Sequence, residues 1–122
     1  MEYKELTEKV IGCTYIVYNK MSFGFLESVY EKCLFIELGK AGLKAETQRS
    51  ITVTYEDEIV GEFVALVVEN TIILELKSVR RIVRAHEVQL VNYLVATRKP
   101  VGLILNFGER KVEIKRKVKE LS

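Results

Sequence analysis

Three strand patterns in the middle of the chain are joined by connections too short for a crossover. Residues 50–55 alternate β-branched and polar side chains, and residues 59–68 and 72–79 are longer apolar runs. Short polar turns, at 56–58 and 69–71, separate them. Parallel strands need a connection of about a dozen residues or more, so these strands are predicted to form an antiparallel meander. The last is apolar on both faces, which is typical of a central strand covered on two sides.

Two helices are predicted ahead of the meander and one after it. Apolar side chains recur at helical spacing over residues 2–19, and again between the break at 20–24 and Gly42. Residues 84–97 predict the third helix. Its expected apolar stripe consists of Val88, Val91 and Val95.

Two more strand patterns follow the third helix. Residues 101–107 are almost entirely apolar, and residues 110–118 alternate apolar and basic side chains, which is typical of a charged edge strand. The order α–α–β–β–β–α–β–β predicts a mixed α/β (α+β) fold with a central sheet of about five strands flanked by helices. We expect residues 1–122 to form one domain, because a chain of 122 residues can bury a single core.

Composition argues against several classes of protein. No apolar run approaches the roughly 20 residues that a membrane-spanning helix needs, and the charged segment MEYKELTEKV lacks the apolar centre of a signal peptide. We therefore expect a cytoplasmic protein. Cys13 and Cys33 lie in helical patterns without a CxxC motif and are predicted to be buried free thiols. With one histidine, a zinc site has almost no support.

The strand IILELKSV, residues 72–79, carries two charges at its end. Glu75 and Lys77 are two residues apart and therefore project from the same face of the strand. Such a pair is either a structural ion pair or a metal ligand beside a residue that orients a water molecule. ExK alone is a weak signal, so both interpretations stay open.

Polar residues on two helices frame this strand. In GFLESVY, Gly24, Glu27 and Tyr30 follow one another at intervals of three, and Glu27 interrupts an otherwise apolar helical stripe. The later segment HEVQLVNY has a polar face that would suit the rim of a site, although a solvated face explains it equally well. This polar face consists of His86, Gln89 and Tyr93.

Arginines gather directly after the Glu/Lys strand. Arg80, Arg81 and Arg84 lie in RRIVR, and residues 110–120 are also rich in Lys and Arg. Such clusters are compatible with a polyanionic partner, and the three arginines are our candidate nucleic-acid contacts. For residues 110–120 a solvated charged face is the better interpretation.

Taken together, these motifs resemble the GxxExxY family of bacteria and archaea, within the PD-(D/E)XK nuclease superfamily. The resemblance extends from about Leu6 to Phe107 and is carried in order by GFLESVYEKCLFIEL, ENTIILELKSV, HEVQLVNYL and LILNFG. It implies a restriction-endonuclease-like core, hydrolysis of phosphodiesters, and Mg²⁺ (or Mn²⁺) as cofactor. It also implies nucleic acid as the partner, with DNA preferred to RNA, and it is compatible with a homodimer.

The resemblance also implies roles for individual residues. Glu27 and Glu75 match metal ligands, and Lys77 matches the lysine that positions or activates the attacking water. Gln89 and Tyr93 match the motif on the following helix, where they would contact phosphate or metal-bound water. Mg²⁺ prefers hard oxygen ligands and keeps several waters, so these residue types suit it.

One carboxylate of the family pattern is missing. The family places an aspartate about ten residues before the glutamate of ExK, and Ala65 occupies that position. Alternation puts Glu62 on the opposite face of the strand and Glu69 near its end, so neither is a direct replacement. Metal binding is therefore expected to be weak or lost.

Three interpretations of Ala65 stay open. The chain is an inactive nuclease-like domain that binds nucleic acid or a protein, or a nuclease with a rearranged ligand set of Glu27 and Glu75, or an active sequence in which Ala65 was engineered. We expect little or no hydrolysis. The alternative function is an inactive protein-interaction module on the same fold, in which the arginines contact a protein.

Overall fold

The computed structural model describes residues 3–119, which form three helices and five strands. The helices are α1 (Lys4–Met21), α2 (Glu27–Lys40) and α3 (Arg84–Thr97). The strands are β1 (Ala45–Tyr55), β2 (Glu58–Val68), β3 (Ile72–Lys77), β4 (Val101–Phe107) and β5 (Val112–Val118). The predicted order of elements is confirmed, and α3 and β4 have the predicted bounds. β1 begins earlier than predicted, because pairing with β2 extends it beyond its alternating segment.

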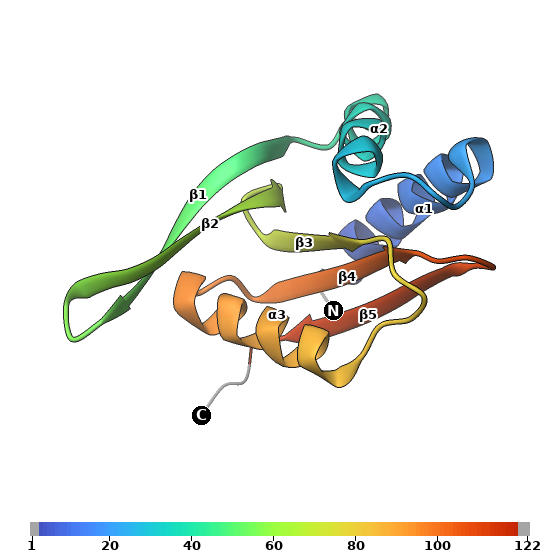
Figure 1. Ribbon diagram of the computed structural model, residues 1–122. Coiled ribbons are helices and arrows are strands. Elements are labelled where there is room, and N and C mark those ends of the chain that lie inside the picture. The colour runs from blue at the N-terminus through green and yellow to red at the C-terminus, as the bar shows by residue number, and fades with distance from the viewer. Residues whose placement is uncertain (1–2, 120–122) are drawn as a thin grey trace.

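All five strands belong to one sheet, in the order β1-β2-β3-β4-β5 (Figure 1). β1, β2 and β3 pair antiparallel, so the predicted meander is confirmed. The crossover through α3 then makes β4 parallel to β3, and β5 returns antiparallel along the edge. The carboxyl ends of β3 and β4 consequently lie at the same edge of the sheet.

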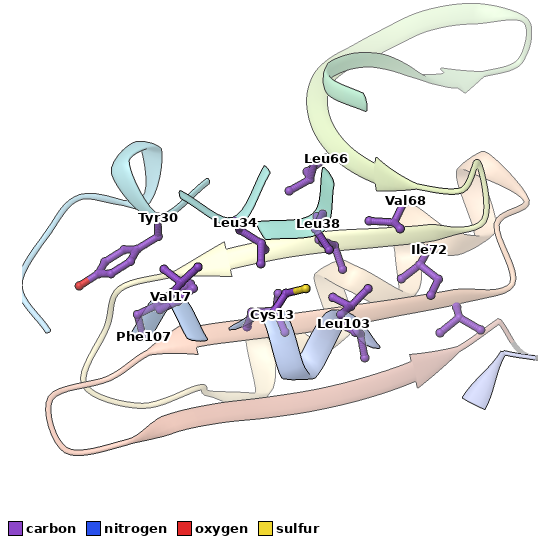
Figure 2. Close-up of a cluster of buried hydrophobic side chains, with 14 residues drawn as sticks. Cys13, Val17, Tyr30, Leu34, Leu38, Leu66, Val68, Ile72, Leu103 and Phe107 are labelled. Atoms are coloured by element: carbon purple, nitrogen blue, oxygen red, sulfur yellow. The ribbon is translucent and has the colours of Figure 1, made fainter. Parts of the chain in front are cut away.

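The helices cover the two faces of the sheet, with α1 and α2 on one face and α3 on the other (Figure 1). The larger hydrophobic cluster joins α1 and α2 to the sheet, and Figure 2 shows Tyr30, Leu34 and Phe107 among its side chains. The smaller cluster lies beneath α3 and includes Leu90 and Leu94. The mixed α/β architecture with helices on a central sheet is thus confirmed.

β3 is buried on both faces, as its sequence predicts. Ile72 and Leu74 belong to the cluster beneath α1 and α2, whereas Ile73 belongs to the cluster beneath α3. Because side chains alternate along a strand, Glu75 and Lys77 continue the row of Ile73 on the α3 face. Both are half-buried.

The apolar stripe predicted for α3 is wrong. Val88 and Val95 are 46% and 54% exposed, whereas Leu90 and Leu94 are fully buried against the sheet. Both sets of residues satisfy helical spacing, so periodicity alone does not choose between them. Shape complementarity chooses, because a Cβ atom on Gly102 of β4 would lie 2.7 Å from the Leu90 side chain. Gly102 has no side chain, and the Leu90 side chain occupies the space that one would need.

Two further predictions concern the cysteines and membrane insertion. Both cysteines are free thiols, and Cys13 is buried as expected for an inert thiol, whereas Cys33 is only half-buried and departs from the expectation of two buried thiols. Among the helices within residues 3–119, none has the length and apolar character that crossing a membrane requires.

Candidate functional site

The segment GFLESVY is held in place by its glycine and its tyrosine. Gly24 has a φ of +118°, in the region that favours glycine. Tyr30 is fully buried, and its ring stacks on a phenylalanine of β4 with centroids 4.1 Å apart. Its hydroxyl donates to the Ser22 carbonyl at 2.5 Å and accepts from the Phe25 N–H at 3.2 Å. These contacts fix the entry into α2 and make Glu27 its first residue.

Glu27 and Glu75 line the same pocket, which has a volume of about 160 Å³. The pocket lies where β2 departs from β3, since these strands pair over only three residue pairs. Glu31 and Gln48 also line it, although the sequence reasoning assigned neither to the site. Glu31 could have been found, because it lies one helical turn after Glu27. Gln48 could not, because a register shift in β1 places it there with a φ of +58°.

Ala65 and Glu75 line the same pocket, at the point where β2 and β3 separate. The last residue pair of the two strands is Leu66 with Leu74, and Ala65 and Glu75 are the next residues beyond it on each strand. Ala65 is 6% exposed and belongs to the cluster beneath α3, so its methyl group points to the face that carries Glu75. The position at which the resemblance implies an aspartate therefore lines the same pocket, and lies on the same face of the sheet, as the glutamate of ExK.

Burial and one charged neighbour shape the electrostatics of Glu75. Burial raises the pKa of the Glu75 carboxyl, and the positive charge of Lys77 opposes this rise. The four ion pairs within residues 3–119 include neither residue. Glu75 and Lys77 thus influence each other through space rather than through a direct ion pair. Burial and the charge of Glu75 both raise the pKa of Tyr93, whose ring stacks on Phe63 with centroids 3.8 Å apart.

The polar face predicted on α3 divides into three environments. His86 accepts a hydrogen bond from the Val83 N–H through Nδ1 at 3.2 Å and so closes the first turn of the helix. Gln89 is exposed to solvent. Tyr93 is half-buried and close enough to Glu75 for its pKa to respond to that charge. The structure therefore brings Tyr93 toward the ExK strand and gives His86 a role in helix capping.

A larger pocket, of about 460 Å³, lies at the carboxyl ends of β3 and β4. Four cationic side chains line it: Arg80, Arg81, Arg110 and Lys111. Two follow β3, and two lie in the turn between β4 and β5. The parallel pairing of β3 and β4 brings these segments together. Arg84 instead lines a separate pocket with Glu87 and Lys117, which form an ion pair at 2.6 Å.

The sequence also matches a family of known proteins. Residues 4–117 match the family described as the PD-(D/E)XK nuclease superfamily. The chain belongs to this superfamily. A search of curated proteins gives no match.

A solved structure has the same fold as this chain. The crystal structure of a protein designated SSO0001 aligns with a TM-score of 0.61 and 15% sequence identity, over 99% of this chain and 61% of that one. At this level of identity the likeness shows the fold alone, and it confirms a restriction-endonuclease-like architecture. This chain spans about three fifths of the length of that structure.

PD-(D/E)XK nucleases generally use divalent metals, but the residues around Glu75 do not form a complete divalent site. Within residues 3–119, no three His, Cys, Asp or Glu side chains lie close enough together to hold an ion. Ala65 offers a methyl group where an oxygen is needed, and Lys77 adds a charge that repels cations. Burial raises the pKa of Glu75, which disfavours its ionised form. Glu27, Glu31 and Glu75 thus line one pocket, but within the described residues 3–119 they are not grouped closely enough to hold an ion.

Proposed function

We propose that this chain uses a PD-(D/E)XK scaffold to bind nucleic acid and hydrolyses it little or not at all. The observation that carries the proposal is Ala65 in the pocket of Glu75, where the described residues 3–119 offer no group of three metal-ligating side chains. The cluster of cations at the ends of β3 and β4 supports retained binding. DNA is preferred to RNA, Mg²⁺ or Mn²⁺ is bound weakly or not at all, and the protein acts in the cytoplasm.

Within the superfamily, we assign the chain to the GxxExxY family. The support comes from Gly24, Glu27 and Tyr30, which have three complementary tasks. The glycine permits the turn, the tyrosine fastens it, and the glutamate begins α2 at the edge of the pocket. All three positions of the motif thus have a physical reason in this fold.

The candidate site residues on β3 and α3 suit the binding of phosphate without cleavage. The Tyr93 hydroxyl, like that of any tyrosine at neutral pH, is protonated, so that it can donate a hydrogen bond to a phosphate oxygen. Lys77 supplies a positive charge on the α3 face of β3. Without a bound metal ion, this charge is available to attract a phosphate group. Gln89, exposed on α3, contributes a neutral donor at the rim. Arg80, Arg81 and Arg84 neutralise the phosphate backbone.

Binding is tested by fluorescence anisotropy with labelled single- and double-stranded DNA and RNA over a range of KCl concentrations. Neutralised phosphates release counterions, so affinity should fall steeply with salt, with a log–log slope of about −3 to −4 if four cations contact phosphates. Arg80→Gln and Arg81→Gln should each lower affinity and make the slope shallower by about 0.7 to 0.9. Arg116→Gln, which changes an exposed arginine of β5 outside the pocket, is the matched control. An affinity indifferent to salt would contradict the proposal.

Cleavage is tested on the same oligonucleotides with Mg²⁺ and with Mn²⁺. We expect intact substrates after prolonged incubation, since the metal lacks a ligand at Ala65. Robust cleavage that disappears in both Glu75→Ala and Lys77→Ala would show instead that Glu27 and Glu75 suffice. Cleavage that persists in these variants would be traced to a contaminant.

A protein-interaction module is the second candidate, and the β1–β2 hairpin favours it. The far end of the hairpin extends away from the rest of the sheet (Figure 1). Tyr55, Ile59 and Val60 there are 67%, 63% and 62% exposed, and such apolar surface is typical of a contact with another protein. Light scattering that finds a dimer in the parent chain and a monomer in Ile59→Ser would support this function, especially if oligonucleotides fail to bind.

A further inference from the structure

The cationic pocket at the ends of β3 and β4 is separate from the pocket of Glu27 and Glu75, and the two share no lining residue. Its four cations face two carboxylates, those of Glu109 and Glu113, which leaves an excess of two positive charges. In open α/β sheets, ligands bind outside the carboxyl ends of parallel strands. Position and charge therefore both indicate an anion site.

Asn106 holds one end of the loop that carries the two arginines. Its side chain is fully buried, with Oδ1 accepting from the Val79 N–H at 2.9 Å and Nδ2 donating to the Val79 carbonyl at 2.9 Å. A side-chain amide that hydrogen-bonds both the N–H and the carbonyl of one residue makes the same two bonds as the backbone of a neighbouring strand. The side chain of Asn106 thus continues the β3–β4 ladder beyond the end of β3.

Glu113 holds the other end of this loop. Its Oε1 accepts from the Ile82 N–H at 3.2 Å and from Asn106 Nδ2 at 3.0 Å. The loop is therefore fastened on both sides of Arg80 and Arg81. The carboxylate of Glu113 is engaged by these donors, so part of its negative charge is compensated before any ligand enters.

The turn that carries the other two cations is also fixed. The Gly108 N–H donates to the Lys111 carbonyl at 3.1 Å, and a Cβ atom on Gly108 would lie 2.7 Å from that carbonyl oxygen. The Tyr18 hydroxyl of α1 donates to the Gly108 carbonyl at 2.6 Å. Both cation-bearing segments are thus held by contacts that leave the arginine and lysine head groups free for a ligand.

We infer that this pocket binds a phosphomonoester, the terminal phosphate of a nucleic-acid strand, and that Asn106 and Glu113 position the arginines that contact it. A phosphomonoester carries about −1.5 to −2 charges at neutral pH, which matches the excess positive charge of the pocket, whereas an internal phosphodiester carries only one. Guanidinium groups bind phosphate through paired hydrogen bonds. That the phosphate belongs to a nucleic-acid strand rests on the proposed function. That the pocket binds a phosphate group rests on the pocket itself.

The test compares single-stranded oligonucleotides that bear a 5′-phosphate, a 3′-phosphate or hydroxyls at both ends. In fluorescence anisotropy, we expect one phosphorylated end to bind about ten-fold more tightly than the hydroxyl form, since charge-assisted hydrogen bonds are gained. Pyrophosphate should compete with it. Arg80→Gln and Arg81→Gln should each abolish this preference, whereas Arg116→Gln should retain it. Equal affinity for all three ends would overturn the inference.

The positioning role is tested by two variants that remove the same negative charge. Glu113→Gln keeps an oxygen that can accept from the Ile82 N–H, so the preference for a phosphorylated end should persist or increase. Glu113→Ala loses the acceptor and should reduce the preference, although the pocket becomes more positive. An equal increase in both variants would show that Glu113 acts through charge alone. Thermal melting checks that each variant folds. If Glu113→Ala does not fold, the Arg80→Gln and Arg81→Gln variants, which change exposed side chains, still test the phosphate site.

Calorimetry with pyrophosphate alone separates this inference from the proposed function. Oligonucleotides that bind with a steep salt dependence but no preference for a phosphorylated end would leave the proposed function standing and remove the pocket from it. Pyrophosphate that binds and is lost in Arg80→Gln, without any oligonucleotide binding, would support the phosphate chemistry. That second result would show that the bound phosphate does not come from a nucleic-acid strand, and it would overturn the proposed function as well.

Discussion

At the scale of single residues, the proposed loss of metal binding rests on one methyl group, that of Ala65, in the pocket of Glu27 and Glu75. Ala65 is buried in the pocket that Glu75 also lines, at the position where the family resemblance implies a second metal-binding carboxylate. Without a metal, the buried carboxyl of Glu75 is poorly solvated, and its pKa rises despite Lys77. Two predictions follow from this exchange of a ligand for a methyl group, one on metal affinity and one on pH.

Ala65→Asp should restore metal binding. Without metal, the variant should melt at a lower temperature than the parent, because a second buried carboxylate repels Glu75. With Mg²⁺ or Mn²⁺, we expect affinity to rise by about ten-fold or more, since a divalent ion gains a hard oxygen ligand. Titration calorimetry measures this gain, with Val60→Asp on the exposed part of β2 as control. If both variants bind metal no better than the parent, Ala65 is not the position of the missing ligand.

Glu75→Gln should stabilise the protein at neutral pH but not in acid. The folded-state pKa of Glu75 lies above the usual 4.5, so the folded state retains the proton more readily than the unfolded state. The associated stability is present below about pH 4.5 and is lost as pH rises through the folded-state pKa. Because glutamine imitates the protonated carboxyl, its advantage in the free energy of unfolding should appear as pH rises.

Urea denaturation between pH 4.5 and 8 measures this effect. Glu27→Gln, which removes an exposed carboxylate from the same pocket, controls for the change in net charge. A stability difference that is constant over this pH range would contradict the role of burial at Glu75.

At the scale of elements, the site depends on how helices and strands begin and end. α2 begins at Glu27 because Tyr30 fastens the preceding loop. β3 ends at Lys77, and the next bonds of its ladder are made by the Asn106 side chain. β1 carries an irregularity that brings Gln48 to the pocket. The functional residues are therefore concentrated at the ends and irregularities of regular elements.

Tyr30→Phe tests the fastening of α2. The substitution preserves the aromatic ring that stacks on Phe107 but removes the hydroxyl that bonds Ser22 and Phe25. We expect the free energy of unfolding to fall by about 1 to 3 kcal/mol, the usual range for losing buried hydrogen-bond partners. Urea denaturation followed by circular dichroism measures it, and Tyr55→Phe at an exposed position should cause no change. An equally small effect in both variants would mean that the stack alone fixes the loop.

At the scale of the whole molecule, the mixed sheet separates two tasks. The fork between β2 and β3 forms the pocket of Glu27 and Glu75, and the shared edge of β3 and β4 forms the cationic pocket. One sheet thus forms the pocket of the candidate metal ligands and the pocket of the proposed anion site from different strand pairs. Within residues 3–119 both pockets are built on the central strand β3, which supplies Glu75 to one and leads directly into Arg80 and Arg81 of the other.

The sequence by itself determined the order of elements, the antiparallel meander, the shared face of Glu75 and Lys77, and the alanine where a carboxylate is expected. Each of these depends on residues close together in the chain, through periodicity, turn length and strand alternation. The tertiary structure decided which face of α3 meets the sheet, where Leu90 occupies the space above Gly102 and Leu90 and Leu94 are buried, while Val88 and Val95 stay exposed. It also decided that Arg110 and Lys111 join Arg80 and Arg81, because only the parallel pairing of β3 and β4 brings these distant segments to one edge.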